Sequence, residues 1–343
     1  MSPGPPPPAT GGRARVLSGI QPTADSFHVG NYLGALANWV SMQDDHEAFY
    51  CVVDLHAITM PHEPDVLRRR TRGAYAQLLA LGLDPGVSTV FAQSQVPEHT
   101  ELSWVLQCLT GHGEAARMTQ FKDKSRRGGL DRATVGLFTY PILQAADILA
   151  YKAQYVPVGE DQRQHLELTR TLAQRFNSRY GELFVVPEPH IAKHAARILD
   201  LQDPTSKMSK SLPSGCLFLL DPPGAIEKKI KRAVTDSVGV VNLDPVNQPG
   251  VANLLTILAA FSGRTVAAVA AEYADLGYGQ LKRAVAETVI GFAEPFAQRV
   301  AGYLEDPAEL DRMMLRGASR ARTVAGPTVR QAYARIGLLP PAE

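Results

Sequence analysis

The chain has 343 residues, more than one ordinary compact core holds, so one large domain and a smaller one are expected. Apolar residues make up 45% and charged residues 20%, and a formal net charge of +1 excludes a global basic field, so any nucleic-acid contact must be a local patch. The three cysteines are far apart, and no apolar run is long enough to span a bilayer. These features argue against a CxxC metal site, a disulfide framework and a membrane protein, and they predict a reducing, cytoplasmic location.

Short apolar runs alternate with helical patterns from about residue 15 onwards. Residues 1–13 are rich in proline and glycine, and we expect a disordered leader without chemistry there. The patterns predict strands at residues 16–18, 49–55, 89–93 and 155–158, and helices at residues 31–42, 65–81, 139–151 and 162–180. Beyond about residue 221 the strand signals fade, and helical periodicity is found at residues 252–261, 279–303 and 308–334.

This order of elements predicts the fold class and the domains. Strands that alternate with helices form parallel βαβ units, so we expect an α/β fold with a Rossmann-like open parallel sheet. The helical final third predicts a separate α-helical domain. We therefore expect a catalytic domain at residues 14–220 and a helical domain at residues 221–343.

The first segment that can carry chemistry follows the first predicted strand. It consists of SGIQPT at residues 18–23 and HVGN at residues 28–31. In open α/β sheets, ligands bind outside the carboxyl ends of the strands, and the free N–H groups at the start of the next helix can bind an anion. The alternative is an ordinary turn in which His28 and Asn31 cap the helix, and the segment taken alone favours that alternative.

The second segment is KMSKS at residues 207–211. Two lysines among small hydroxyl residues suit a loop that binds a polyphosphate, because lysine acts as a point charge on phosphate oxygens. An ordinary surface loop is the alternative interpretation. A specified string of five residues arises by chance only about once in 10,000 chains of this length, which favours the phosphate-binding loop.

Together, the two segments resemble the signatures of class I aminoacyl-tRNA synthetases. HVGN is similar to the HIGH signature, with Asn31 in place of its last histidine, as in the tryptophanyl branch, and KMSKS matches the second signature letter for letter. Further stretches resemble the bacterial-type tryptophanyl branch from about Leu17 onwards: NYLGAL at 31–36, ARMTQFK at 116–122, AADIL at 145–149, GEDQ at 159–162 and AVTDS at 233–237.

The resemblance implies a nucleotide site that binds ATP with Mg²⁺ and has no structural metal. The residues implied to bind ATP are Gln21, His28, Gly30, Asn31, Gly159, Asp161, Lys207, Met208, Ser209, Lys210 and Ser211. Lys207 and Lys210 would stabilise the departing pyrophosphate, and Lys124 would be a further phosphate contact, although a solvated lysine is an equal alternative there. The attacking carboxylate is already ionised at neutral pH, so no activating base is needed.

For the amino acid, Asp147 is the leading candidate. It lies in an apolar helical segment, where a carboxylate is costly unless it accepts hydrogen bonds, and indole has one N–H that only donates. The alternative is an Asp147 that is held by an arginine or caps a backbone N–H. The resemblance implies ammonium contacts from Tyr140 and Gln162, while the other residues implied around the substrate are Gln144, Val156, Val158, His56 and Leu17.

Two departures from the family pattern keep rival functions open. Leu17 stands where many members have phenylalanine, and Gln144 stands where methionine is common. Tyr140, Gln144 and Asp147 are spaced like the tyrosine-binding residues of tyrosyl-tRNA synthetases, so a tyrosyl enzyme is one rival. A catalytically silent RNA-binding relative is another, although Lys207 and Lys210 are both present.

The resemblance also implies partners: tRNA(Trp), L-tryptophan, ATP and a second copy of the chain in a homodimer. The helical domain would then bind the anticodon. Arg312, Arg316 and Arg320 share a helical face that can bind RNA phosphates, as can Lys228, Lys229, Lys231 and Arg232, and a solvated basic face is the alternative for both groups. The candidate dimer interface is residues 98–118.

Overall fold

The computed structural model describes residues 12–118, 134–157, 159, 162–190, 196–210 and 212–339. Its strands are β1 (Arg15–Ile20), β2 (Glu47–Val52), β3 (Thr89–Ala92), β4 (Tyr155–Pro157) and β5 (Glu188–His190). Its helices up to residue 180 are α1 (Val29–Asn31), the π-helical η1 (Tyr32–Leu36), α2 (Ala37–Met42), α3 (Asp54–Ala57), α4 (Pro64–Ala80), the 3₁₀ turn η2 (Gln93–Gln95), α5 (Glu98–Gln107), α6 (His112–Ala116), α8 (Val135–Leu149) and α9 (Arg163–Tyr180). The later helices are α10 (Pro223–Lys231), α11 (Pro249–Ser262), α12 (Val266–Tyr273), α13 (Gly277–Glu305) and α14 (Pro307–Ile336).

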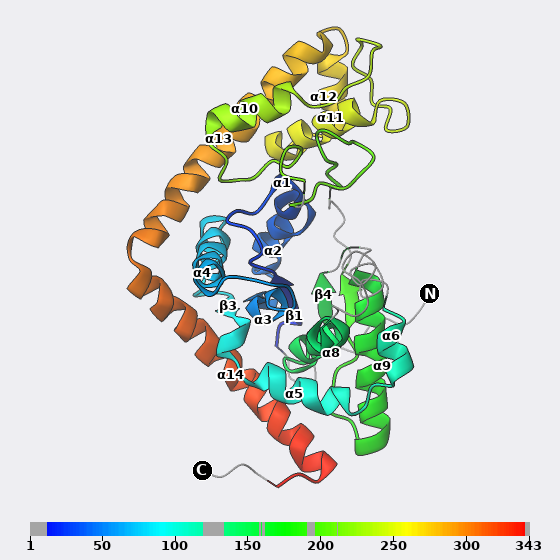
Figure 1. Ribbon diagram of the computed structural model, residues 1–343, viewed down its shortest axis with the longest axis vertical. Helices are drawn as coiled ribbons and strands as arrows, with labels where there is room; N and C mark the ends of the chain where they lie inside the picture. The colour runs from blue at the N-terminus through cyan, green and yellow to red at the C-terminus, as the bar shows by residue number, and fades with distance from the viewer. Residues whose placement is uncertain are drawn as a thin grey trace.

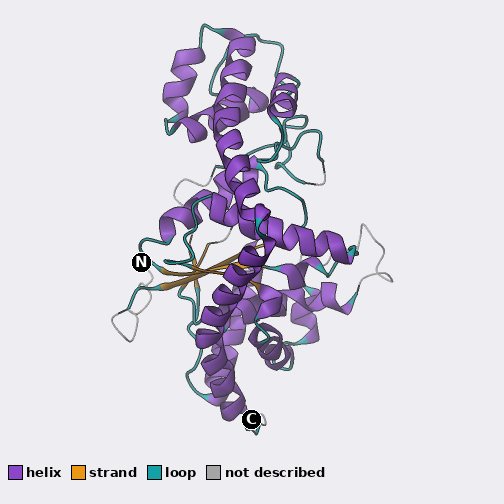
Figure 2. Ribbon diagram, turned by 90° about the vertical axis from the view of Figure 1, so that its left-hand side faces the viewer, coloured by secondary structure: helices purple, strands orange, loops and turns teal. Residues whose placement is uncertain are grey.

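The five strands form one parallel sheet in the order β3-β2-β1-β4-β5, surrounded by helices (Figure 2). This confirms the predicted α/β class with an open parallel sheet. Alternate residues of a strand enter different cores: Val16 packs into the cluster that includes α11 and α13, and Leu17 packs into the cluster that includes α5, α8 and α9. Both faces of the sheet are therefore covered, as a parallel sheet requires.

The strand order places the ligand edge of the sheet. The chain runs outward from β1 to β2 and β3 on one side and to β4 and β5 on the other. Such a switch point leaves a crevice outside the carboxyl ends of the two central strands, here β1 and β4. The segments that follow Ile20 and Pro157 flank this crevice, and both hold residues predicted to bind ATP.

Three features differ from the sequence-based expectations. The strand predicted at 49–55 ends at Val52, because the Asp54 carboxylate accepts a hydrogen bond from the backbone N–H of Leu55 (3.1 Å) in the new helix α3. The helix predicted at 31–42 begins at Val29 and contains one π-helical segment. Strand β5 was not predicted, because Glu188–His190 has the sequence EPH and no apolar pattern.

The final helix returns to the sheet after the helices α10 to α13 have formed the far end of the molecule (Figure 1). Helix α14 packs against β3, α5 and α4, and its residues Ala321 and Ala325 are fully buried. The C-terminal region is thus helical, and its last helix also covers the sheet. The boundary at residue 221 between a catalytic domain and a helical domain remains a prediction.

The closest approach of α14 to the sheet is at Gly317. A Cβ there would lie 1.9 Å from the Val90 carbonyl oxygen of β3, a separation that no side chain tolerates. We expect Gly317→Ala to lower the free energy of unfolding by about 1–3 kcal/mol, because the helix must move away from the strand.

The midpoint of urea denaturation measures this effect. Gly291→Ala on α13 is the matched control: an added Cβ meets nothing within 4 Å there, so we expect a gain of about 0.5–1 kcal/mol from helix propensity. Equal midpoints for the two variants would contradict the close packing of α14 on β3.

No single helix in the described ranges is both long and apolar enough to cross a membrane. Helices α11 and α12 meet the length and composition test only as a pair, and that pair is bent by 116°.

Candidate active site

The two signature segments meet at one end of the sheet. The ammonium Nζ of Lys210 donates a hydrogen bond to Thr23 Oγ1 (3.3 Å), in the turn that follows β1. The chain after the KMSKS loop runs beside the HVGN segment: the backbone N–H of Val29 donates to the Leu217 carbonyl (2.9 Å), and that of Leu219 donates to the Phe27 carbonyl (2.8 Å). Segments about 190 residues apart in sequence are therefore held together by backbone pairing, which a phosphate-binding cleft built from both requires.

His28 caps helix α1, as the simpler of the two interpretations predicted. Its Nδ1 accepts from the backbone N–H of Asn31 (3.1 Å), and the Asn31 side-chain oxygen accepts from the backbone N–H of His28 (3.3 Å). Burial, with Lys210 and then Lys207 nearby, lowers the pKa of His28 to about 3. The ring is therefore neutral at pH 7, and because Nδ1 accepts, Nε2 carries the proton.

Gly30 allows the KMSKS loop to lie close to this turn. A Cβ at Gly30 would lie 3.0 Å from His28 Nδ1 and 3.6 Å from the Met208 Cβ. The Met208 side chain is 2% exposed and belongs to the core, so it anchors the loop between its two lysines. Burial lowers the pKa of Lys210 to about 8, which leaves its ammonium charged at neutral pH.

Asp147 is buried on α8 and accepts hydrogen bonds from three side chains. His56 Nε2 donates to Oδ2 (2.8 Å), while Gln93 Nε2 (2.8 Å) and His99 Nδ1 (2.5 Å) donate to Oδ1. Burial would raise the pKa of Asp147, but the contacts with His56 and His99 outweigh it and hold that pKa well below its usual range. Asp147 is therefore an ionised acceptor, and among the described residues neither an arginine nor a backbone N–H holds it.

The other predicted amino-acid contacts lie on the elements around Asp147. Leu17 on β1 and Val156 on β4 are both 4% exposed and pack into the same core as α8. The Tyr140 hydroxyl lies 2.9 Å from His165 Nε2, and Gln144 Nε2 donates to Gln162 Oε1 (3.3 Å). The Gln144 amide therefore points towards Gln162 of the segment after β4, and Gln144 and Asp147 lie on the same helix.

For several other predicted residues, the structure gives only their position and exposure. Gln21, Gly159 and Lys207 are exposed, the first in the loop after β1, the second after β4 and the third in the KMSKS loop. Ser209 is half-buried. The remaining predicted residues lie outside the described part of the chain: Lys124, Val158, Asp161 and Ser211.

Sequence reasoning missed the residues that surround Asp147. They are Gln93, His99, Tyr151 and, one step further out, Asp54, which accepts hydrogen bonds from both the backbone N–H (2.9 Å) and the hydroxyl (2.5 Å) of Ser94. Gln93 had a usable signal, because it is the last residue of the strand predicted at 89–93 and so lies at the ligand edge. His99 had none: only the packing of α5 on α8 brings it to Asp147.

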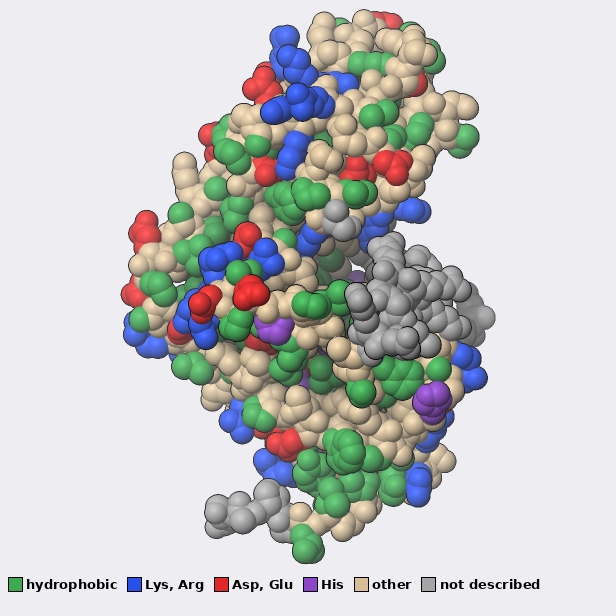
Figure 3. Space-filling model, in the orientation of Figure 1, with side chains coloured by type: hydrophobic (Ala, Val, Ile, Leu, Met, Phe, Trp, Pro, Cys, Tyr) green, Lys and Arg blue, Asp and Glu red, His purple; other side chains and the backbone are tan. Residues whose placement is uncertain are grey.

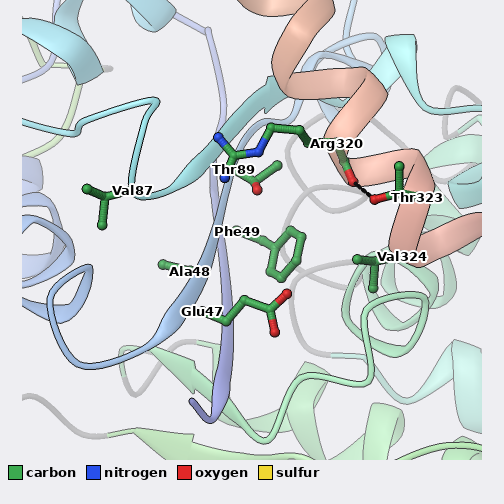
Figure 4. Close-up of a pocket in the computed structure, with 8 residues that line it drawn as sticks. All are labelled: Glu47, Ala48, Phe49, Val87, Thr89, Arg320, Thr323 and Val324. Carbon is green, nitrogen blue, oxygen red and sulfur yellow. Dashed lines mark hydrogen bonds between the residues drawn. The ribbon is translucent and has the colours of Figure 1, made fainter. Parts of the chain in front are cut away.

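A separate pocket of about 140 Å³ lies at the opposite, amino-terminal edge of the sheet (Figure 4). It is enclosed by the first residues of β2 and β3 and by one face of α14, and its lining residues are Glu47, Ala48, Phe49, Val87, Thr89, Arg320, Thr323 and Val324. Arg320 donates to the Pro85 carbonyl at its rim. None of the residues predicted to bind ATP or the amino acid contributes to this pocket, and Arg320 is the one lining residue predicted to contact RNA.

Comparisons with known proteins agree with the site. A family model for tRNA synthetases class I (W and Y) matches residues 9–294. Tryptophan–tRNA ligase 2 of Streptomyces avermitilis is 58% identical over 330 residues, which cover 96% of this chain and 98% of that protein. Tryptophanyl-tRNA synthetase from Mycoplasma pneumoniae superposes with a TM-score of 0.88 at 35% identity, covering 95% of this chain and 98% of that one. The Campylobacter jejuni enzyme complexed with ADP and tryptophan superposes at 0.82 and 33% identity, covering 94% and 100%.

Proposed function

Because the chain belongs to the class I tryptophanyl- and tyrosyl-tRNA synthetase family, we infer that it is a tryptophan–tRNA ligase. It activates L-tryptophan with ATP to tryptophanyl-adenylate and pyrophosphate, and then transfers tryptophan to the 3′ end of tRNA(Trp). The geometric observation that carries this function is the contact between Lys210 and Thr23, which joins the two signature segments over the carboxyl edge of the sheet.

The first chemical step needs positioning and charge stabilisation. The tryptophan carboxylate attacks the α-phosphorus of ATP, and pyrophosphate departs with its negative charge. The amino-acid side of the site begins at Asp147 and the phosphate side at Lys210, so the substrate carboxylate would lie between them over the ends of β1 and β4. Fixed positive charges at the pyrophosphate stabilise the transition state more than the ground state, because charge builds up there.

We assign the phosphate contacts to the KMSKS loop and the turn after β1. Lys207 and Lys210 bind pyrophosphate together with the Mg²⁺ that accompanies ATP, and Lys124 adds a third charge. Gln21, His28, Gly30 and Asn31 lie along the nucleotide, and Gly159 and Asp161 along its ribose. Met208, Ser209 and Ser211, from the same KMSKS sequence, complete the proposed contacts. This assignment is supported by the pKa of His28. Burial is the main cause that lowers this pKa, and the nearby charges of Lys210 and Lys207 lower it further.

For tryptophan, we assign the indole N–H to Asp147, the ammonium group to Tyr140 and Gln162, and the walls of the indole slot to Leu17, Val156 and Val158. His56 and Gln144 complete the surroundings. The support for Asp147 is chemical: it is 3% exposed, ionised and surrounded by donors, so it can only accept from a substrate.

Amino-acid-dependent exchange of pyrophosphate into ATP tests this function. We expect kcat/KM with tryptophan to exceed that with tyrosine by at least about 100-fold, since a phenol hydroxyl also needs a donor in the pocket. The second candidate, tyrosine activation, is favoured by one observation: Gln144 and Asp147 lie on the same helix. A higher kcat/KM with tyrosine would establish that alternative.

For tRNA, we propose the α10 cluster, defined as Lys228, Lys231 and Arg232, as the main phosphate contact. In the described ranges these three side chains have no ion-pair partner, and Lys and Arg side chains gather over α10 and α13 (Figure 3). Lys228 and Arg232 also line a pocket of about 330 Å³ with Gln202 and Ser214. On α14, by contrast, Arg312 and Arg316 bind Glu309, and Arg320 binds the Pro85 carbonyl.

We further propose a homodimer that works in the cytoplasm. Residues 98–118 include Trp104, whose side chain is 67% exposed on α5, and hydrophobic side chains gather over this part of the surface (Figure 3). An aromatic side chain of this size left in water is typical of a protein interface. The three cysteines are free thiols, which suits a reducing compartment.

A further inference from the structure

Counted over the described residues, the hydrogen bonds to Asp147 leave it one acceptor position. An ionised carboxylate offers about four lone-pair sites. Gln93 and His99 use two on Oδ1, and His56 uses one on Oδ2. The position that remains is on Oδ2, and indole carries a single N–H to fill it.

The orientation of His99 depends on Tyr151. A carboxylate only accepts, so His99 Nδ1 must carry the proton that it shares with Asp147. In the neutral ring Nε2 is then an acceptor, and the Tyr151 hydroxyl, 2.7 Å away, donates to it. Burial raises the pKa of Tyr151 well above its usual value, so the hydroxyl keeps its proton. Both side chains are fully buried, so water does not compete for these bonds.

Gln93 is fixed in the same manner. Its Nε2 donates to Asp147 Oδ1, and its Oε1 accepts from the backbone N–H of Leu55 (3.1 Å), which sets the direction of the amide. The N–H donors of Gln93 and His99 that face Asp147 are thus already hydrogen-bonded to Oδ1 before substrate binds. A phenol oxygen in this place would need a donor, and neither side chain directs a second one at Oδ2.

We propose that His99 and Tyr151 are positioning residues for tryptophan selection: the chain Tyr151–His99–Asp147 holds the carboxylate so that it presents one acceptor, matched to the indole N–H. This rests on the proposed function, because it assumes that Asp147 receives that N–H. A tyrosine substrate is disfavoured by the same arrangement, since its hydroxyl oxygen gains no donor.

Tyr151→Phe tests the proposal by removing one oxygen. The ring contacts with Phe49 (4.6 Å between centroids) and Phe91 (5.8 Å) can remain. Without the hydroxyl, His99 Nε2 loses its donor and the ring is held only through its bond to Asp147, so the carboxylate is oriented less firmly. In pyrophosphate exchange we expect the KM for tryptophan to rise about tenfold, with kcat changed less than about twofold.

The discriminating substrate is β-(benzothiophen-3-yl)alanine, in which sulfur replaces the ring N–H. We expect its KM to be high with the wild-type enzyme and unchanged with Tyr151→Phe, because it donates nothing to Asp147. Tyr75→Phe is the matched control: the Tyr75 hydroxyl is also buried, but it makes no hydrogen bond within the described ranges, so both KM values should stay unchanged.

A pair of substitutions at His99 gives a second measurement, for use if Tyr151→Phe folds poorly. His99→Asn places an amide donor near the Nδ1 position and should retain most of the difference in KM between tryptophan and the sulfur analogue. His99→Leu has no donor and should lose that difference. Equal increases in KM for tryptophan and the sulfur analogue, or equal behaviour of the Asn and Leu variants, would overturn the proposal. A wild-type enzyme that shows no tryptophan-dependent exchange would instead refute the proposed function.

Discussion

Replacing Lys210 with alanine should lower the rate of tryptophanyl-adenylate formation by about 10²- to 10³-fold, the usual effect of removing one charge that stabilises a transition state. The Lys210 ammonium lies at the junction of the KMSKS loop and the turn after β1. Its pKa, lowered by burial to about 8, leaves it charged at pH 7, and a bound polyphosphate would hold the proton more tightly still. The change should appear mainly in kcat of tryptophan-dependent pyrophosphate exchange.

Lys231→Ala supplies the matched control for this variant. Lys231 is an exposed lysine on α10, and exchange contains no tRNA, so the rate should remain at the wild-type value. An unchanged rate in Lys210→Ala would contradict the proposed role and would favour the silent RNA-binding alternative.

Asp147→Asn should reduce kcat/KM for tryptophan by about 10³-fold. An asparagine has one acceptor oxygen where aspartate has two, so its NH₂ must face either His56 or the pair Gln93 and His99. In either orientation at least one buried donor loses its acceptor. When the NH₂ group takes the place of Oδ2, the indole N–H of the substrate loses its acceptor as well. A site built to hydrogen-bond a substrate group loses several orders of magnitude in kcat/KM when one of the two hydrogen-bonding partners is missing.

The same substitution should lower the free energy of unfolding by about 1–3 kcal/mol, measured by urea denaturation, because the network lies in the core. Asp311→Asn is the control. Asp311 forms a half-exposed ion pair with Arg72 on the surface (2.7 Å), so the loss there should stay below about 1 kcal/mol, with exchange unaffected. Wild-type kcat/KM in Asp147→Asn would show that the indole nitrogen binds elsewhere.

The parts of the fold that the sequence predicts are those with local causes. Apolar runs predicted β1 to β4, and helical periodicity predicted α4, α8, α9, α11, α13 and α14, to within a few residues at most ends. Strand β5 was missed because it consists of only three residues at the sheet edge and holds a proline, so hydrophobic burial does not mark it. The π-helical segment η1 had no sequence signal.

The site divides in the same way. His28 and Asn31 are three residues apart, so their capping contacts follow from local geometry, and the KMSKS loop was identified from five adjacent residues. The surroundings of Asp147 could not be predicted. His99 lies 48 residues from it and Gln93 lies 54, and only the packing of α5 and β3 beside α8 brings them within hydrogen-bonding distance. The roles of Lys124, Val158, Asp161 and Ser211 stay predictions.

The return of α14 to β3 has a consequence for biosynthesis. Helix α14 begins more than 200 residues after β3 ends, so a ribosome must translate nearly the whole chain before the part of the sheet at β3 that α14 contacts can be covered. Until then the nascent protein exposes apolar side chains that chaperones recognise. A premature stop codon before residue 307 would remove this cover altogether, and the truncated product should aggregate or be degraded even though both signature segments had already been made.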